Sequence, residues 1–191
     1  MDMLSKQSLY IINRWDVVSD VLEAVGGLRQ ELTTFLYSLE AELRGQEWWS
    51  QDLRFMRYGD ASVYITCVSW QVNEEDAVWI GIEGATVENF FGTGPGAKRC
   101  VWISGRHSSL RSSLLEAFQG MENEILGDAP NVTGGHVLRH MVRKCLPNEE
   151  AGDYLKNVHT ETVQFMGEAI ELLRSCGSTI EDYIAGPNTQ A

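Results

Sequence analysis

The sequence predicts an α+β protein with a single antiparallel four-stranded sheet flanked by helices, in the order α-ββββ-ααα. Three observations predict this class. Apolar residues recur at helical spacing up to Arg44, at a spacing of two between Arg54 and Ser104, and at helical spacing again after Ser108. A run of strands followed by a run of helices favours segregated α and β layers over a parallel βαβ arrangement.

Length and composition indicate one domain. The chain has 191 residues, of which 43% are hydrophobic, and both values are typical of one globular unit with its own core. We therefore predict a single domain over residues 1–191, with an N-terminal lead-in at 1–15 and a flexible tail at 185–191.

The first helix is predicted from about Asp16, as its N-cap, to Arg44. An apolar stripe runs along it and includes Leu28, Leu32 and Phe35. The pair Gly26-Gly27 interrupts this stripe without shifting its phase, which indicates either a bend or the close approach of another backbone.

Four strands are predicted at Arg54–Tyr58, Ser62–Val72, Val78–Ile82 and Lys98–Ser104. A tight turn at Gly59-Asp60 joins the first two, and a polar turn separates the second from the third. Connections this short between successive strands predict antiparallel pairing.

The rest of the chain is predicted to be helical. The segments are Ser108 to Ile125, Gly134 to Cys145, and Glu149 to Ile184, and Gly177-Ser178 divides the last of them. Pro147 ends the second segment because proline removes a backbone donor.

Targeting and cysteine patterns predict a cytoplasmic protein without a membrane segment. No apolar run approaches the roughly 20 residues needed to cross a bilayer, and the segment Met1–Asp16 lacks the features of a secretory signal. The four cysteines are widely separated and form no CxxC pair, so we expect free thiols in a reducing compartment. No cofactor is predicted.

Charge is unevenly distributed along this acidic chain, whose formal net charge is −12. Between Tyr58 and Ala97 all the charged residues are acidic, namely Asp60, Glu74, Glu75, Asp76, Glu83 and Glu88. Nucleic acid would be repelled at long range, which makes direct nucleic-acid binding unfavourable. A protein partner with a basic surface is favoured instead.

The glycine-rich loop Gly92–Lys98 has two interpretations. It differs from a phosphate-binding P-loop because its glycines alternate, Arg99 replaces the serine or threonine, and a strand follows. Its amides could still hold an anion, with the site built from Gly94, Gly96, Lys98 and Arg99 together with the basic residues Arg139 and Arg143. Alternatively, it only connects two strands.

His136 and His140 are one helical turn apart in the predicted helix, a spacing that can chelate zinc. The glutamate that zinc hydrolases carry after the first histidine is replaced by Val137, and Arg139 and Arg143 would repel a dication. No metal site is predicted.

No catalytic residue is predicted either. Ser104 and His107 stand three positions apart at the end of a strand, which directs them to opposite faces. Glu83 ends a strand where a carboxylate could hold magnesium, but Ala85 replaces the lysine of the nuclease pattern Glu-x-Lys.

Tryptophans recur on the predicted strands at Trp70, Trp79 and Trp102. Under helices these side chains would form core, whereas on an uncovered face they would form a recognition surface rimmed with acids.

The function that this sequence favours is that of a non-enzymatic acidic interaction protein. The predicted partner-binding residues are Asp60, Glu74, Glu75, Asp76 and Trp79. One version is an inhibitor whose carboxylates imitate nucleic-acid phosphates, as small phage-encoded anti-defence proteins do. The alternatives are an enzyme or small anionic-ligand binder that uses Gly92–Lys98, and an acidic chaperone or adaptor that forms a homodimer through its long helices.

Overall fold

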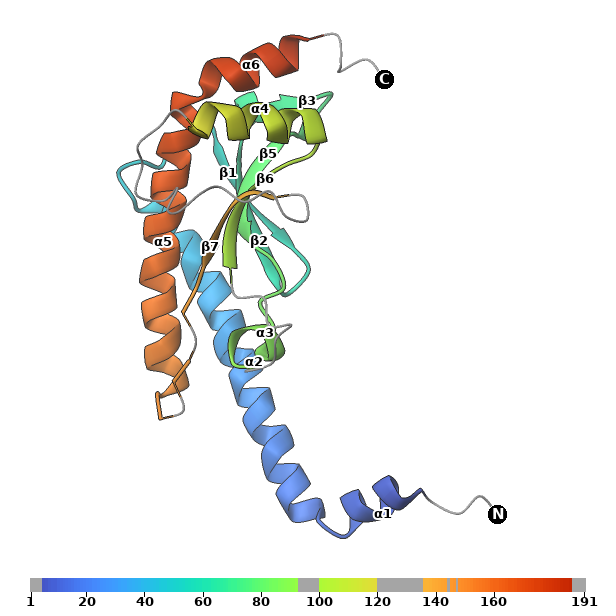
Figure 1. Cartoon of the computed structure of the whole chain (residues 1–191). Helices are drawn as coiled ribbons and strands as arrows, with labels where there is room; N and C mark the ends of the chain where they lie inside the picture. The colour runs from blue at the N-terminus through green and yellow to red at the C-terminus, as the bar shows by residue number, and fades with distance from the viewer. Residues whose placement is uncertain (1–4, 93–99, 120–135, 144, 147, 187–191) are drawn as a thin grey trace.

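The structure is a computed structural model that describes residues 5–92, 100–119, 136–143, 145–146 and 148–186 (Figure 1). Its helices are α1 (Lys6–Ile12), α2 (Trp15–Arg44), α3 (Val87–Phe90), α4 (Ser108–Gln119), α5 (Ala151–Ser175) and α6 (Gly177–Ala185), with a 3₁₀ turn, η1, at Val68–Trp70. Its strands are β1 (Leu53–Tyr58), β2 (Ser62–Cys67), β3 (Gln71–Val72), β4 (Glu75–Asp76), β5 (Val78–Ile82), β6 (Cys100–Gly105) and β7 (His136–Met141).

The predicted α+β class with an antiparallel sheet flanked by helices is confirmed. The main sheet has the strand order β1-β2-β5-β6-β7, and every neighbouring pair is antiparallel. The prediction of a single four-stranded sheet is wrong, because the main sheet has five strands and β3 and β4 form a separate two-stranded sheet.

The predicted strand Ser62–Val72 is in fact two strands. β2 ends at Cys67, η1 turns the chain, and Gln71–Val72 pairs with Glu75–Asp76 across a turn. Asn73 and Glu74 adopt the positive φ angles of 52° and 68° that a two-residue hairpin turn requires. Trp70 is buried in the core at this bend, so a tertiary contact favours the break that local alternation did not reveal.

The predicted helix Gly134–Cys145 is wrong over His136–Met141, which form β7 at the edge of the sheet. β7 pairs with β6 through contacts such as Ile103 with Leu138. Val137 and Leu138 are buried within β7, and Val142 is buried just after it. Their spacing, which resembles that of a helix, therefore comes from burial along a strand and the residue that follows it. Backbone pairing with β6 satisfies the ladder bonds that this edge would otherwise lack.

At the N-terminus, the predicted lead-in contains α1, and α2 starts one residue before the predicted cap. Asp16 is therefore not the N-cap; Arg14 occupies that position without a side-chain hydrogen bond. α2 continues through Gly26-Gly27 as one helix of 30 residues. The predicted division of the C-terminal helix is confirmed, since α5 ends at Ser175 and α6 begins at Gly177.

The core lies on one face of the sheet, beneath α2 and α5. Val63, Ile65 and Ile80 are buried on this face, together with Leu39 of α2 and Met166 of α5. Burial of these apolar side chains is the main force that holds the helices on the sheet.

One buried tyrosine links separate parts of this core. The Tyr154 hydroxyl of α5 lies within hydrogen-bond distance of the carbonyl oxygens of Phe90 and Arg143, both at 3.1 Å. This contact fixes the end of α3 and the segment after β7 against α5.

His159 of α5 lies in a groove between α2 and α5, where it predicts a pH effect on stability. Burial lowers the pKa of its imidazole below the ordinary 6.5, opposed by Glu42 and the Ser38 carbonyl. The folded state disfavours the charged imidazole, so folding is most stable where His159 is neutral in both states, above the ordinary pKa of 6.5. This contribution of His159 to stability is lost as the pH falls through the lowered pKa of the folded state. Thermal melts from pH 7 to pH 5 should therefore show a melting temperature that falls by a few degrees more in the parent than in His159→Leu. An equal fall in both proteins would contradict this prediction.

Candidate functional site

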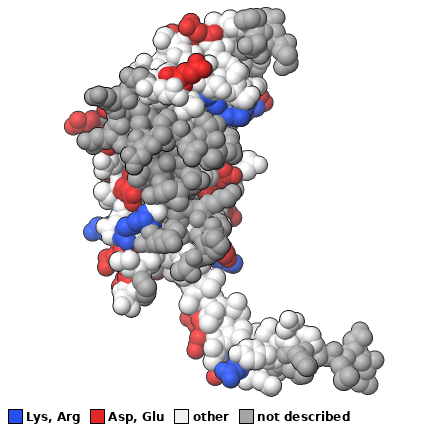
Figure 2. Space-filling view, viewed as in Figure 1, with Lys and Arg blue, Asp and Glu red and all other residues white. Residues whose placement is uncertain are grey.

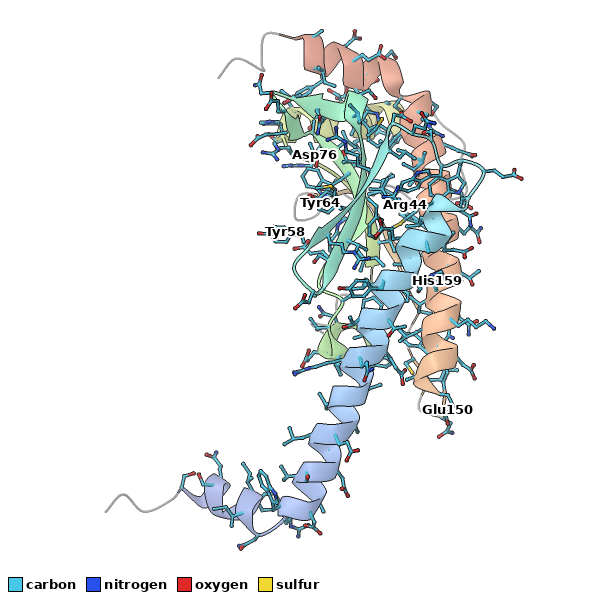
Figure 3. All side chains as sticks on the ribbon, turned by 180° about the vertical axis from the view of Figure 1, so that it is seen from behind. Arg44, Tyr58, Tyr64, Asp76, Glu150 and His159 are labelled. Carbon is cyan, nitrogen blue, oxygen red and sulfur yellow. The ribbon has the colours of Figure 1, made fainter. Side chains whose placement is uncertain are left out.

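The face of the sheet opposite the core carries aromatic side chains. Strand alternation places Tyr64, Trp79 and Trp102 on this face, because their neighbours Ile65, Ile80 and Ile103 point into the core. Figure 3 shows Tyr58 and Tyr64 on the side of the sheet away from α2 and α5. Trp79 therefore lies on the face away from α2 and α5, whereas Trp70 belongs to the core.

A slot forms on this face where Gly81 sits between two aromatic residues. Gly81 pairs with Tyr64 on one side and with Trp102 on the other. A Cβ atom at Gly81 would lie 2.4 Å from the Val63 carbonyl oxygen and 2.7 Å from the Tyr64 Cβ, so glycine is required there. Its missing side chain leaves the floor of a hollow of about 290 Å³.

The walls of this slot are aromatic and its rim is charged. The lining comprises Tyr58, Ser62, Val63, Tyr64, Asp76, Trp79, Gly81, Ile82, Glu83, Trp102 and Arg106. The ring centroids of Tyr64 and Trp79 are 6.4 Å apart, which is contact distance for a tilted pair. Burial, and then the nearby carboxylate of Asp76, raise the pKa of the Tyr64 phenol, so this hydroxyl stays protonated at neutral pH. Trp102 is only 5% exposed.

Of the acids predicted on the turn, Asp76 lines the slot, Glu75 lies at its end, and Glu74 occupies the turn of the β3–β4 hairpin outside the lining. Arg106 forms an ion pair with Glu75 and donates from Nε to the Asp76 carbonyl at 3.1 Å. The Asp76 carboxylate accepts a hydrogen bond from Gln71 at 2.9 Å. Glu75 and Asp76 are therefore already bonded within the chain, and their attraction for an external cation is smaller than the sequence suggested.

The remaining predicted partner-binding residue is separate from the slot. Asp60 lies in the turn between β1 and β2, beside a small hollow that Tyr37 and Arg57 also line. The structure thus brings Asp76 and Trp79 together in the slot, with Glu75 at its end, and leaves Asp60 outside it.

The predicted anion site falls largely outside the described residues. Gly94, Gly96, Lys98 and Arg99 belong to that part, and of Arg139 only the backbone is described. Arg143 is engaged in an ion pair with Glu149. Hydrogen bonds from the Arg143 guanidinium lower the pKa of the Glu149 carboxyl to about 2, so this pair is formed at neutral pH.

The residues considered for catalysis and metal binding have other positions. Ser104 is buried in β6, while His107 packs against the Tyr183 ring of α6 with centroids 6.0 Å apart. His136 and His140 lie on a strand rather than a helix. Within the described ranges, no group of three or more histidine, cysteine, aspartate or glutamate side chains could hold a metal ion.

The cysteines that the structure describes are not paired with one another. Cys67, Cys145 and Cys176 are free thiols, and burial raises the pKa of each. In the part of the chain that the structure covers, no helix is long and apolar enough to span a membrane.

Sequence reasoning missed the importance of Gly81, Tyr58 and Tyr64. An isolated glycine within a strand is a signal of close approach by another backbone or a ligand, and Ile80-Gly81-Ile82 carries that signal. In comparisons with known proteins, no family model matches the chain, and no curated protein or solved structure is significantly similar to it.

Proposed function

We propose that this chain is a non-enzymatic interaction protein that binds a partner with a basic surface through the aromatic slot. The observation that carries the proposal is the combination of four aromatic residues with two carboxylates around one hollow, namely Tyr58, Tyr64, Trp79, Trp102, Asp76 and Glu83. Aromatic faces attract cations, and the carboxylate of Glu83 adds to that attraction, whereas that of Asp76 adds less because it already accepts a hydrogen bond from Gln71. The charge of Arg106, which also lines the slot, is matched by its ion pair with Glu75.

The size of the slot indicates which part of a partner enters it. About 290 Å³ is at the lower end of the range for small-molecule pockets, so the slot suits one side chain better than a whole metabolite. A planar guanidinium stacks on aromatic rings and forms forked hydrogen bonds with carboxylates, which favours arginine over lysine. The net charge of −12 would steer such a basic partner toward this chain.

Inhibition of a nucleic-acid-acting enzyme by charge mimicry is a narrower version of this proposal. It requires that Glu74, Glu75 and Asp76 act together, and the hydrogen bonds of Glu75 and Asp76 within the chain reduce their contribution. The anion-binding alternative draws no support from Arg143, whose charge is matched by Glu149.

The proposal predicts that a tetra-arginine peptide binds at the slot. Titration should shift the indole N–H signals of Trp79 and Trp102 in NMR spectra, and tetra-lysine should bind more weakly. Trp79→Leu should reduce the affinity for tetra-arginine at least about tenfold, because it removes one stacking wall. Trp15→Leu is the matched control, since Trp15 is exposed on α2 and does not line the slot.

Two outcomes would overturn the slot as the binding site. The first is an unchanged spectrum at millimolar tetra-arginine, and the second is an equal loss of affinity in Trp15→Leu and Trp79→Leu. Reversal of Glu74, Glu75 and Asp76 to lysine tests the narrower version separately. If the hairpin imitates nucleic-acid charge, this reversal should slow association with the basic partner by more than about tenfold at low salt. An unchanged association rate would exclude charge mimicry by the hairpin.

A further inference from the structure

The N-terminal part of the chain forms an arm that projects away from the body of the molecule (Figure 1). We define this arm as residues 5–27, which comprise α1 and the first turns of α2. Seven of its large apolar side chains are between 44% and 62% exposed: Tyr10, Ile11, Ile12, Trp15, Val17, Val21 and Leu22. In the view of Figure 2 the arm stands apart from the body, and most of its visible surface is uncharged.

The apolar stripe of the arm continues the stripe that packs α2 into the core. Apolar residues follow the alternating three-and-four spacing of a heptad at Val18, Val21, Val25, Leu28, Leu32, Phe35 and Leu39. Leu32, Phe35 and Leu39 are buried, whereas Val18, Val25 and Leu28 are half-buried and Val21 is exposed. The sequence therefore maintains a packing seam beyond the point where the chain's own body covers it.

The end of that cover is set by α5. Gly27 of α2 and Gly152, the second residue of α5, line the same groove, so α5 begins at the level of Gly27. Upstream of Gly27, α2 has no counterpart of α5 among the described residues. An apolar helical seam without cover is unstable in water, and helix pairing is the usual way to bury it.

We propose that a second copy of this chain covers the arm, with the two arms packed antiparallel as a dimer. The seven exposed side chains, at about 100 Å² each, offer roughly 700 Å², against approximately 800 Å² per partner of a stable interface. Val21 lies on the seam, Val17 and Leu22 flank it, and the other four extend the apolar surface over α1 and the start of α2. This inference is independent of the aromatic slot, which lies on the sheet.

The length of the free seam determines the register of the pair. Leu32 is the first seam residue that is buried, so we take the free part of the seam as Val18 to Leu28, whose last residue lies at the level where α5 begins. A two-fold axis at the midpoint of this stretch passes beside Glu23. Val18 of one copy then packs against Leu28 of the other, and Val21 against Val25. The antiparallel arrangement keeps the two bodies at opposite ends, and it brings each Trp15 level with the turn that contains Glu31 of the second copy.

A lipid surface is the alternative occupant, and the charges of the arm disfavour it. The arm carries Asp16, Asp20 and Glu23 against Lys6 and Arg14. Interfacial helices that bind anionic membranes are instead rich in lysine and arginine on their polar face.

Sedimentation equilibrium of the full chain tests the dimer. We expect the parent to be dimeric at micromolar concentration. The double variant Val21→Asp/Leu22→Asp should dissociate at least about a hundredfold more readily, because association would bury unpaired carboxylates. Val68→Asp is the matched control, since Val68 is an exposed valine of the body, and it should remain as dimeric as the parent.

A parent chain that stays monomeric up to about 100 μM would overturn the dimer. A double variant that dimerises like the parent would show that the arm is not the interface. Circular dichroism melts of the double variant check that its body remains folded. We expect it to, because Val21 and Leu22 are both more than half exposed. Flotation of the parent with vesicles of anionic lipid, together with a monomeric state in solution, would assign the arm to a membrane instead.

Photo-cross-linking tests the antiparallel register. With p-benzoylphenylalanine in place of Trp15, irradiation should join this position to a peptide around Glu31 of the second copy. A cross-link to a peptide around position 15 of the second copy would instead show parallel arms and overturn the proposed arrangement.

Discussion

The variant Phe35→Ala should unfold with a free energy about 3–5 kcal/mol lower than that of the parent chain. Phe35 is 5% exposed on α2, and its ring lies 5.9 Å from the ring of Phe90 and 5.9 Å from that of His159. It thus joins α2 to α3 and α5 at once. Truncation would leave a cavity at this junction, which backbone relaxation closes only in part.

Tyr37→Ala is the matched control for that experiment, because Tyr37 lies on the same helix with 60% of its surface exposed. Its ring stacks on the Arg57 guanidinium at 3.8 Å, a contact of about 0.5–1 kcal/mol at an exposed site. Denaturant unfolding measures both variants. A loss below about 0.5 kcal/mol for Phe35→Ala would place this side of α2 outside the core.

The variant Gly81→Val should be destabilised by about 3 kcal/mol or more, and it should also lose the slot. The new Cβ would meet the Val63 carbonyl oxygen at 2.4 Å, and this obstacle is backbone that a rotamer change does not move. β2 and β5 would have to separate, which weakens their ladder, and the added methyl groups would fill the floor between Tyr64 and Trp102.

Gly26→Ala is the opposite case and controls for glycine replacement in general. A Cβ at Gly26 meets nothing within 4 Å, and alanine is favoured over glycine in a helix by about 1 kcal/mol. Gly26→Ala should therefore raise the midpoint of denaturant unfolding while Gly81→Val lowers it. A Gly81→Val chain as stable as the parent would show that β2 and β5 can separate at little cost. It would contradict the assignment of Gly81 as the tightly enclosed floor of the slot.

The sequence pointed to two of the residues that line the candidate site, Asp76 and Trp79. Tryptophan recurs on the predicted strands, which indicates Trp79, and acids cluster in a predicted turn, which indicates Asp76. The slot itself depends on the register that sets Gly81 between Tyr64 and Trp102. Register depends on hydrogen bonds between strands distant in sequence, so local periodicity did not reveal which aromatic residues are neighbours.

The ion pairs also show which contacts depend on the tertiary structure and not on the sequence alone. The sequence shows that Glu75 and Arg106 carry opposite charges, but they are separated by 31 residues, and only the β5–β6 pairing brings them together. Likewise Arg143 and Glu149 lie near each other in sequence, yet their bidentate contact depends on the turn that enters α5. Both pairs neutralise groups that the sequence alone offered as free ligands.

The sequence by itself determined the α+β class, α2 up to Arg44, the strands β1 and β5, and the division of α5 from α6. Each of these follows from local periodicity or from a glycine at a helix end. Only the tertiary structure decided that Trp70 turns into the core and that His136–Met141 pair with β6 as a fifth strand. Those outcomes depend on burial and on edge hydrogen bonds supplied by distant segments, which outweigh the propensities of a few residues.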